Sequence, residues 1–345
     1  MENNQNMPLV IWFSNWFSAT RNVILSMREA FPWATFIGTH TSENCAYRDV
    51  VDEFYIEPKG LSTNDYVNYT VNFCKEHNVK VFFPHTYMLG ISSSIDGFKQ
   101  VGTSVICDDR MNIELFQSKD KVYKCLKALF YDKVPKYVIA NTSEEFKKAY
   151  EGFVSQEEQV CFKFDKDEGA TSFRLIDQGL NSFSSLRNKC ENVLTFEAAF
   201  NAIKDGEELG KLPPIMIMPK LLSPEVSVDC YMTADGEFIA IPRYKLGGRI
   251  KEIRLTKELI DDSYKLWKLF HFRGPFNVQY RWTPSGEPKL LEVNTRMSGG
   301  IHLSELSGYS IPNQVIADII GYNINQSSKN IKEVRVTQYE NPVTL

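Results

Sequence analysis

The chain has 345 residues, of which 43% are hydrophobic and 24% charged, and its formal net charge is -4 at pH 7. This composition is typical of a folded protein, and the length predicts two or three packed units because one hydrophobic core usually serves fewer residues. The slightly acidic balance argues against broad, charge-driven nucleic-acid binding. A basic cluster in this chain is therefore expected to bind one small anion.

The seven cysteines are scattered and odd in number, without a C-x-x-C pair, which indicates a reducing compartment. The apolar stretch "MPLVIWF" is too short for a signal peptide, and no apolar run approaches membrane-spanning length. We expect a cytoplasmic protein that does not enter the membrane.

The first hundred residues alternate between short β-type runs and helical patterns. The expected strands are residues 9–13, 34–38, 79–84 and 103–107. Between them, "TNDYVNYTVNFCKEHN" predicts a helix with Thr63 as its N-cap. The alternation predicts a small parallel sheet covered by helices. The first strand-to-helix connection, "SNWFSATRN", lacks a G-x-G-x-x-G pattern, so this unit is expected to shape a substrate cleft, or only to pack, rather than to bind nucleotide.

The pattern changes after residue 108. It predicts basic amphipathic helices in "SKDKVYKCLKALF" and "EEFKKAYEGF", then a strand, a polar loop and a strand in "QVCFKFDKDEGATSFRLI". An Asp235-Gly236 turn predicts a first hairpin, and "FNVQYRWTPSGEPKLLEVN" a second. The tail after Gly321 is polar and is expected to pack loosely.

The second hairpin carries an unusual polar pattern. If its loop is centred on Ser285 and Gly286, Gln279 lies opposite Glu292 and Asn277 opposite Asn294, on one face. A carboxylate flanked by amide oxygens suits Mg²⁺ shared with water and phosphate oxygens. An amphipathic hairpin with its polar face in solvent remains the alternative. A register slip of one residue would place the two sets on opposite faces.

The segment "GPFNVQYRWTPSGEPKLLEVNTRMSGGIHLSELSGY" resembles the ATP-grasp superfamily, particularly its carbamoyl-phosphate-synthase-like and carboxylate-amine ligase branch. The resemblance implies an α/β fold class, with an ATP-grasp domain preceded by a small parallel α/β domain. The expected boundaries are 1–108 for the N-terminal domain, 109–325 for the ATP-grasp domain and 326–345 for the tail. The ATP-grasp domain divides into a first lobe with a flap, 109–218, and a second lobe with the metal site, 219–325.

The resemblance also implies roles for the residues of this segment. Gln279, Glu292 and Asn294 match positions that hold the metal ions bridging the ATP phosphates. Arg296 matches a position that neutralises the acyl phosphate or the carboxylate being activated, for which a planar, permanently charged group is suited. The run 298–300 would let backbone N–H groups approach the reacting anion.

Other ATP contacts are implied upstream. Lys121 matches the first phosphate-side lysine, with Lys119 as a competitor. Lys163 lies in an apolar strand, where a buried ammonium requires an anion. The resemblance implies that this anion is a nucleotide phosphate, and a structural carboxylate is the alternative. The loop 167–172 corresponds to the flap over the phosphates, but Gly169 is its only glycine, and a simple turn is the alternative.

The stretch "MPKLLSPEVSVD" resembles the hinge that meets the adenine. Met218 and Lys220 fall at the adenine side, and Glu225 at the ribose-hydroxyl position. Pro219 stands where an acidic residue commonly follows, and proline offers neither an N–H nor a side-chain acceptor. Adenine selectivity through that position is therefore in doubt.

Three further residues are candidates for the reacting end of the site. Arg243 fits a triphosphate-side or acceptor-side arginine, with Lys245 and Arg249 as companions; for Lys245 a solvated surface role is the favoured alternative. His302 follows the glycines and would border the reacting groups. His85, after a strand end, could reach the same cleft.

The implied activity is ADP-forming ligation with ATP and Mg²⁺, with Mn²⁺ as an alternative metal. A small-molecule carboxylate would form an acyl phosphate, which an amine or thiol then attacks. The alternatives are phosphoryl transfer without ligation, and a catalytically degenerate module that binds nucleotide for regulation. Nucleic acid and membrane are not expected as partners, and a homodimer is the default assembly.

Overall fold

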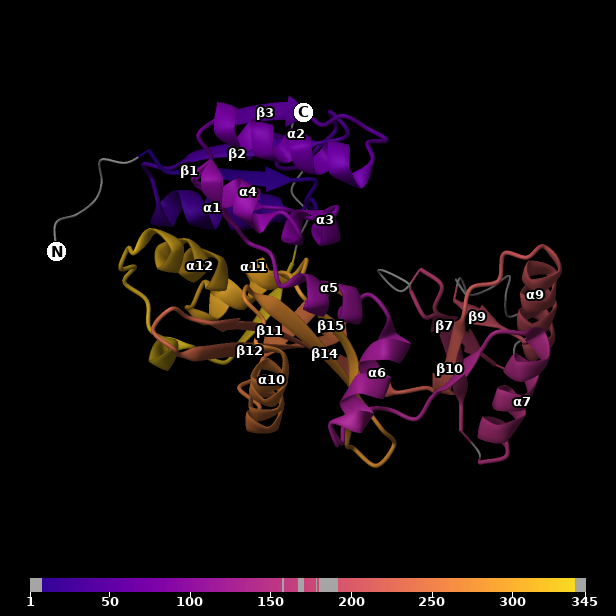
Figure 1. The fold of residues 1–345 in the computed structure, drawn as a ribbon. Helices are drawn as coiled ribbons and strands as arrows, with labels where there is room; N and C mark the ends of the chain where they lie inside the picture. The colour runs from indigo at the N-terminus through magenta and orange to yellow at the C-terminus, as the bar shows by residue number, and fades with distance from the viewer. Residues whose placement is uncertain (1–7, 157, 167–170, 178, 180–191, 339–345) are drawn as a thin grey trace. The chain divides into compact units, whose positions relative to one another are not determined.

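The computed structural model describes residues 8–156, 158–166, 171–177, 179 and 192–338. Helices and strands are both substantial, which confirms the predicted α/β class (Figure 1). The chain divides into two compact units: unit 1 comprises 1–114, 224–279 and 293–345, and unit 2 comprises 115–223 and 280–292. Unit 1 thus groups the N-terminal domain with most of the expected second lobe, while the domain boundaries drawn from sequence remain predictions.

Unit 1 begins with a parallel sheet, as the sequence predicts, and its strand order is β3-β2-β1-β4-β5. Neither this order nor β3 was among the expectations from sequence. Its strands are β1 (Val10–Ser14), β2 (Thr35–His40), β3 (Glu53–Ile56), β4 (Val81–Phe83) and β5 (Ser104–Val105). Its helices are α1 (Thr20–Ala30), η1 (Arg48–Val50), α2 (Thr63–Glu76), α3 (Met88–Ser92) and α4 (Ile95–Gln100). The strand order reverses between β1 and β4, and in such sheets ligands bind beyond the carboxyl ends of the strands at that point.

The predicted N-cap of α2 is wrong by one residue. The Ser62 hydroxyl accepts a hydrogen bond from the backbone N–H of Asp65, so Ser62 is the N-cap and Thr63 the first helical residue. Ser62 and Thr63 are both good caps by residue type, and only the backbone conformation distinguishes them.

The second sheet along the chain belongs to unit 2 and has the strand order β6-β10-β7-β8-β9. Its strands are β6 (Val138–Ala140), β7 (Val160–Phe164), β8 (Arg174–Ile176), β9 (Val193–Leu194) and β10 (Ile215–Pro219). Helices α7 (Ser143–Val154) and α9 (Phe196–Glu208) cover one face, where Phe146 and Ile203 pack against Phe162 and Ile217 (Figure 1). The opposite face carries Lys163. The chain enters this unit through α5 (Arg110–Phe116) and α6 (Lys119–Ala128), and α6 confirms the predicted basic helix.

The third sheet has the order β15-β14-β11-β12-β13-β16. Its strands are β11 (Leu222–Met232), β12 (Phe238–Gly247), β13 (Ile250–Ile253), β14 (Phe276–Trp282), β15 (Pro288–Asn294) and β16 (Val334–Thr337). The accompanying helices are α10 (Lys257–Phe270), α11 (Ile301–Ser304), η2 (Glu305–Ser307), α12 (Ile311–Ile320) and η3 (Ser328–Asn330). Both predicted hairpins are present, and both place a glycine at positive φ in the turn, Gly236 at 86° and Gly286 at 85°.

The expectation of a loosely packed tail is wrong for the described residues up to 338. Strand β16 pairs antiparallel with β13, and Ile324, Ile331 and Val334 pack against the core. A four-residue edge strand has little intrinsic signal, because its partner lies far away in the sequence.

One hydrophobic core joins the N-terminal sheet of unit 1 to the third sheet. Phe13 and Phe83 from the first sheet share it with Ile241 of β12 and with Ile311 and Val315 of α12. The other face of the N-terminal sheet packs separately beneath α2. The core of unit 1 therefore holds the ends of β1 and β4 in a fixed relation to the segment that follows β15.

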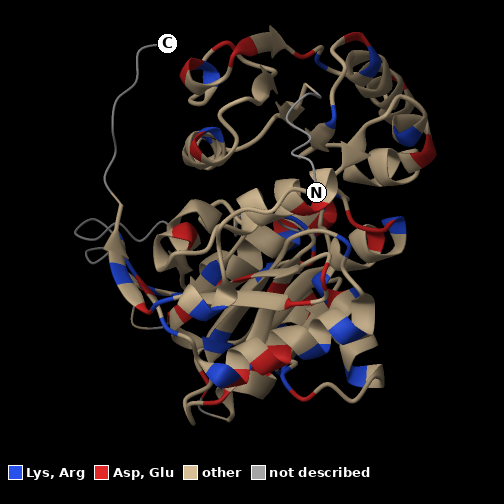
Figure 2. Ribbon diagram, turned by 90° about the vertical axis from the view of Figure 1, so that its left-hand side faces the viewer, with Lys and Arg blue, Asp and Glu red and all other residues tan. Residues whose placement is uncertain are grey.

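No helix of the described residues is long and apolar enough to cross a membrane. Acidic and basic residues are interspersed along the described elements (Figure 2).

Candidate functional site

A buried polar network occupies one face of the third sheet in unit 1. The Asp229 carboxylate on β11 accepts a hydrogen bond from Asn277 Nδ2 on β14 at 2.9 Å and from Ser304 Oγ at 2.6 Å. Its Oδ2 also lies 3.4 Å from Nη2 of Arg243 on β12. All three charged or amide side chains are buried. A buried ion pair is stable only when hydrogen bonds satisfy its remaining atoms, and this network supplies them for Asp229.

Gln279 extends this polar face. Its Nε2 lies 3.4 Å from Oδ1 of Asn277, two residues earlier on the same strand, so the two amides share one side of β14 as predicted. On the other side of β14, Phe276, Val278 and Tyr280 are buried.

The predicted register of the second hairpin is wrong at its turn. The N–H of Thr283 donates to the carbonyl of Glu287 at 2.9 Å, whereas the predicted pairing would place Thr283 opposite Pro288. The bounds of β14 and β15 agree with this turn. The hairpin geometry therefore gives no independent support for placing Gln279 opposite Glu292.

Glu292 lies near the end of β15, among residues of unit 2. Its carboxylate Oε2 lies 3.6 Å from Nζ of Lys119 at the first turn of α6. The Tyr123 hydroxyl of the same helix donates to the carbonyls of Leu290 and Leu291 at 3.0 and 2.9 Å, which holds this part of β15 against α6. Lys121 is exposed, and its backbone N–H donates to the N-cap hydroxyl of Ser118. The two competing lysines are thus in different positions: Lys119 faces Glu292, and Lys121 faces solvent.

The glycine loop after β15 encloses the guanidinium of Arg243. Ser298 Oγ accepts a hydrogen bond from Arg243 Nη2 at 3.1 Å. A Cβ added to Gly300 would lie 2.6–2.8 Å from three atoms of that guanidinium, whereas one added to Gly299 would meet only Phe17, at 3.7 Å. Gly300 is therefore required for the close approach of Arg243, a reason different from the expected opening of its backbone to an anion.

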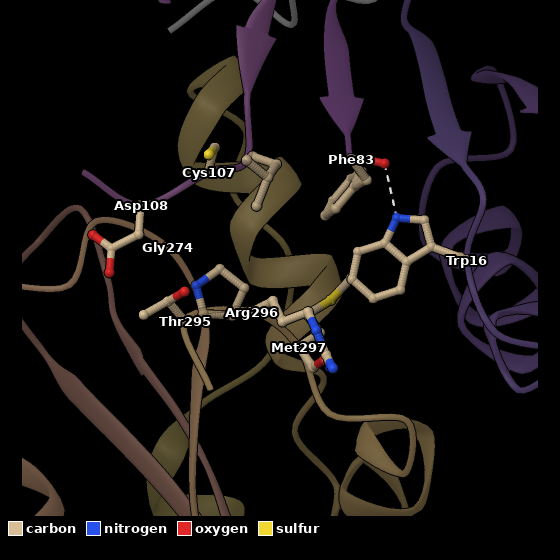
Figure 3. A pocket seen from close by; sticks show the side chains of 10 residues that line it. Trp16, Phe83, Cys107, Asp108, Gly274, Thr295, Arg296 and Met297 are labelled. Atoms are coloured by element: carbon tan, nitrogen blue, oxygen red, sulfur yellow. Dashed lines mark hydrogen bonds between the residues drawn. The ribbon is translucent and has the colours of Figure 1, made fainter. Parts of the chain in front are cut away.

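Arg296 lies against the carboxyl ends of β1 and β4. Its Cζ is 5.0 Å from the centroid of the Phe17 ring, and the Phe17 and His85 rings are 4.4 Å apart. Figure 3 shows Arg296 and Met297 beside Trp16, whose indole Nε1 donates to the Phe83 carbonyl at 2.8 Å. These aromatic residues follow the two strands between which the strand order reverses. The N-terminal domain thus supports the arginine that the sequence singled out.

The charge on Arg296 also acts on His85. Burial, and then the positive charge of Arg296, lower the pKa of His85 to about 4. This imidazole is therefore neutral at pH 7, which avoids placing a second cation beside Arg296.

His302, on α11, is close to the Arg243 network. Burial, and then the charge of Arg243, lower the pKa of His302. The structure therefore places His302 with Arg243, and His85 with Arg296, as two separate imidazole–arginine groups.

Lys163 lies on the face of the unit 2 sheet that α7 and α9 leave uncovered. It pairs with Met216 of β10 and is buried; two residues before it, Cys161 pairs with Met218. The positive charges of Lys163, Arg281 and Lys220 act against the burial that raises the pKa of the Cys161 thiol. Three cations thus gather around one point of unit 2.

The hinge residues differ in their surroundings. Met218 is buried at the end of β10, and the Lys220 ammonium donates to Oε1 of Gln159 at 3.0 Å. Glu225, on β11 in unit 1, forms an ion pair with Lys245 of β12. Lys245 is therefore engaged with a proposed ATP contact, rather than only solvated as favoured from sequence. Gly169 lies outside the described residues.

Comparison with known proteins gives the fold a name. Residues 211–342 match the sequence model of a family described as ATP-grasp in the biosynthetic pathway with Ter operon. Among solved structures, an ADP complex of N5-carboxyaminoimidazole ribonucleotide synthetase superimposes with a TM-score of 0.67 at 13% identity, covering 95% of this chain and 81% of that one. Residues 211–342 thus resemble an ATP-grasp family, and the chain as a whole shares the fold of this solved structure.

Two further ATP-grasp structures show the same extent of similarity. The ADP complex of N5-carboxyaminoimidazole synthetase from Staphylococcus aureus gives a TM-score of 0.64 at 15% identity, covering 92% of this chain and 79% of that one. The biotin carboxylase–β,γ-ATP complex from Campylobacter jejuni gives 0.66 at 16% identity, covering 96% and 74%. No curated protein sequence matches the chain.

The expected metal ligands suit a hard cation. Gln279, Glu292 and Asn294 offer only oxygen donors, and a single carboxylate leaves several positions for phosphate oxygens and water, as Mg²⁺ prefers. Among the described residues, no three His, Cys, Asp or Glu side chains cluster as a self-sufficient metal site. The donor chemistry fits a metal brought in with nucleotide, and the ligand assignment stays a prediction.

Sequence reasoning missed two residues of the candidate site. Asp229 alternates with Ser227 in "SVDCYM", so the strand pattern already placed both on one face, but the partner Asn277 lies 48 residues away. Phe17 lies in the connection "SNWFSATRN", for which the sequence showed only the absence of a glycine pattern. Its contact with Arg296 joins segments that are far apart in the sequence.

Proposed function

We propose that this protein is an ATP- and Mg²⁺-dependent, ADP-forming ligase that joins a small-molecule carboxylate to an amine, with a thiol as the alternative nucleophile. A carboxylate oxygen attacks the γ-phosphorus of ATP, the bond to the β-phosphate oxygen breaks, and ADP leaves. The amine nitrogen then attacks the acyl carbon, the C–N bond forms, phosphate departs and the nitrogen loses a proton.

The observation that carries this proposal is the arginine held by the glycine loop. Arg243 is buried, its Nη2 makes every hydrogen bond found for it among the described residues, and its Nε has no partner there. A fixed guanidinium with unused donor capacity can stabilise a developing oxyanion without reorganising. Arg243 lies beside Ser298 and Gly300, which follow the E-x-N-x-R segment in the sequence. This supports a role for Arg243 at the reacting phosphate or carboxylate.

Arg296 supplies a second cation in the same segment of unit 1. Its guanidinium lies over the Phe17 ring, and its Nη1 donates to the Met297 carbonyl at 3.1 Å, so its orientation is fixed. We assign it to the carboxylate being activated. His302, neutral at pH 7 because its pKa is lowered, can accept the proton that the amine loses.

The proposed nucleotide contacts are those that the resemblance implies. In unit 2, Lys163, Lys121 and Lys220 would hold the phosphates and the adenine side, and Met218 would pack beside the base. Glu225 would bind the ribose hydroxyls. Mg²⁺, held by Gln279, Glu292 and Asn294, would offset the phosphate charge; positioning and charge stabilisation supply most of the catalysis of phosphoryl transfer.

We place the reaction in the cytoplasm, and this is supported by the free state of the six cysteines that the described residues contain.

The test is to incubate the protein with Mg-ATP and pools of carboxylic acids and amines, then to quantify ADP, AMP and phosphate by chromatography. The proposal expects ADP and phosphate in equal amounts, dependent on both pools. AMP would contradict it, a stable phosphorylated product would favour a phosphotransferase, and nucleotide binding without turnover would favour a regulatory module.

Two variants of the second hairpin sharpen this test. Glu292→Gln removes the only carboxylate of the proposed metal set and should abolish turnover while leaving the thermal unfolding transition in place. Glu287→Gln, at an exposed carboxylate in the turn of the same hairpin, is the matched control and should keep wild-type activity.

A further inference from the structure

Unit 1 contains an open cavity of about 830 Å³, and His302 is the one lining residue that the proposed mechanism uses. Residues of α1 form one wall, and residues from His302 to Ser310 form another. Cavities of this size accommodate small organic molecules. Its lining includes Arg21, Glu29, His302 and Glu305.

Two of these side chains have unmet hydrogen-bonding capacity. Among the described residues, Oε1 of Glu305 and both ring nitrogens of His302 are buried without a hydrogen-bond partner. A buried polar atom left unpaired costs about 1–3 kcal/mol. Three such atoms lie on two neighbouring side chains that line the cavity, and a polar ligand that reached them would relieve this cost.

The charges of the cavity select the kind of ligand. Arg21, a cation in the lining, is neutralised by Asp49, to which its Nε and Nη2 donate at 3.1 and 2.7 Å. Glu29 has no ion pair with any described residue, and its charge adds to the burial that raises the pKa of Glu305. His302 is neutral at pH 7. The cavity therefore presents uncompensated carboxylate and attracts a cation.

The cavity also borders the reacting loop. His302 lines it and lies close enough to Arg243 for that charge to lower its pKa. His302 is thus the lining residue that connects the cavity with the Arg243 network.

We propose that this cavity binds the ammonium group of the amine substrate, with Glu305 as its anchor and His302 between the amine and the reacting loop. This inference rests on the proposed ligase function and names the subsite of its nucleophile. Glu305 holds the ammonium form outside the reaction centre, and His302 is the base available when the amine moves to attack.

The proposal predicts a pH dependence. Burial is the main cause that raises the pKa of Glu305 to about 7; Asp229 and Glu29 raise it further, while hydrogen bonds from Ser26 and Ser310 oppose this. Glu305 is consequently protonated for the most part at pH 6 and charged at pH 8. The pKa of His302 is lowered, so this imidazole opposes cation binding less than an ordinary histidine would. An amine that remains protonated throughout should bind more tightly at pH 8.

The test is isothermal titration of the full-length protein with putrescine, ethanolamine and L-lysine, each at pH 6 and pH 8. At least one probe should bind more tightly at pH 8, and Glu305→Gln should weaken that probe at least tenfold and remove the pH dependence. Glu76→Gln, at an exposed carboxylate at the end of α2, is the control and should bind as wild type does. Asn22→Trp, at an exposed lining position, should block binding without touching the core.

The outcomes separate this inference from the proposed function. If no probe binds, or if both Glu305→Gln and Asn22→Trp bind as wild type does, the cavity proposal is overturned. If amine-dependent ADP formation is found but its apparent KM for the amine is unchanged in Glu305→Gln, the ligase stands and the subsite is wrong. Probe binding that depends on Glu305, in a protein that forms no ADP, would remove the ligase and leave a cation-binding cavity.

Discussion

The close contact between Gly300 and Arg243 yields a quantitative prediction. In Gly300→Ala, the new Cβ would lie 2.6 Å from Nη1, 2.7 Å from Cζ and 2.8 Å from Nη2 of Arg243. Ordinary van der Waals contact begins near 3.4 Å, so the guanidinium must retreat by roughly 0.6–0.8 Å. It is buried and held by Asp229, Ser227 and Ser298, so it cannot retreat without lengthening those bonds.

The expected cost follows from these bonds. Hydrogen bonds to a charged group contribute about 1.5–3 kcal/mol each, so the loss of one of them destabilises the fold by about 1.5–3 kcal/mol. At about 2–4 °C per kcal/mol, the Tm should fall by roughly 3–12 °C. The displaced cation should also lower kcat by about 100-fold, the usual effect of losing one oxyanion-stabilising donor.

Differential scanning fluorimetry and the ADP-release assay measure both effects. Gly299→Ala is the control, because its Cβ meets only Phe17, at 3.7 Å, and it should change Tm by less than about 2 °C. Arg243→Lys removes the atoms that clash, so Gly300→Ala should cost less in that background, with a coupling energy of about 1 kcal/mol or more. Equal effects of the two alanine variants, or additive effects of Gly300→Ala and Arg243→Lys, would refute this reasoning.

Three further predictions follow from the site. Lys121→Ala should raise the apparent KM for ATP about tenfold while leaving the Mg²⁺ concentration at half-saturation unchanged. Lys119→Ala should shift the Mg²⁺ concentration at half-saturation, because Lys119 faces Glu292; the reverse pattern would exchange the roles of the two lysines. Phe17→Leu should lower kcat/KM about 3- to 30-fold with a Tm near wild type, since a cation–π contact contributes about 0.5–2 kcal/mol; unchanged kinetics would remove Phe17 from the site. Because the pKa of His85 is lowered to about 4 in the folded chain, the unfolded chain binds a proton below about pH 6.5 that the folded chain binds only near pH 4. The free energy of unfolding, measured with urea, should therefore decrease as the pH is lowered from 6.5 to 4, and it should decrease less steeply in His85→Gln.

The sequence predicted elements whose signals are local. The two hairpins were identified from turn residues, and Gly236 and Gly286 indeed adopt positive φ. Strand β3 was missed because "EFYI" is a largely exposed edge strand without apolar alternation. Strand β16 was missed because its pairing with β13 is non-local. Local pattern thus predicted what turns and periodicity determine, and failed where pairing alone determines the structure.

The same distinction applies to the site. The spacing of Glu292, Asn294 and Arg296 could be read from one segment, and so could the lysine inside the apolar strand β7. The register of the hairpin could not, because a turn of one extra residue changes the pairing without changing the pattern. The contacts of Arg296 with Phe17 and of Asp229 with Asn277 join distant segments. Neither could be found before the sheets were assembled.

The central claim is that a carboxylate is activated by the γ-phosphate of ATP, and hydroxylamine trapping tests it most directly. The protein is incubated with Mg-ATP, a pool of carboxylic acids and hydroxylamine, which replaces the natural amine, and hydroxamate, ADP and AMP are quantified together. The account predicts hydroxamate and ADP in equal amounts, both lost in Glu292→Gln. Hydroxamate accompanied by AMP, or ADP release without hydroxamate under every carboxylate pool, would contradict it.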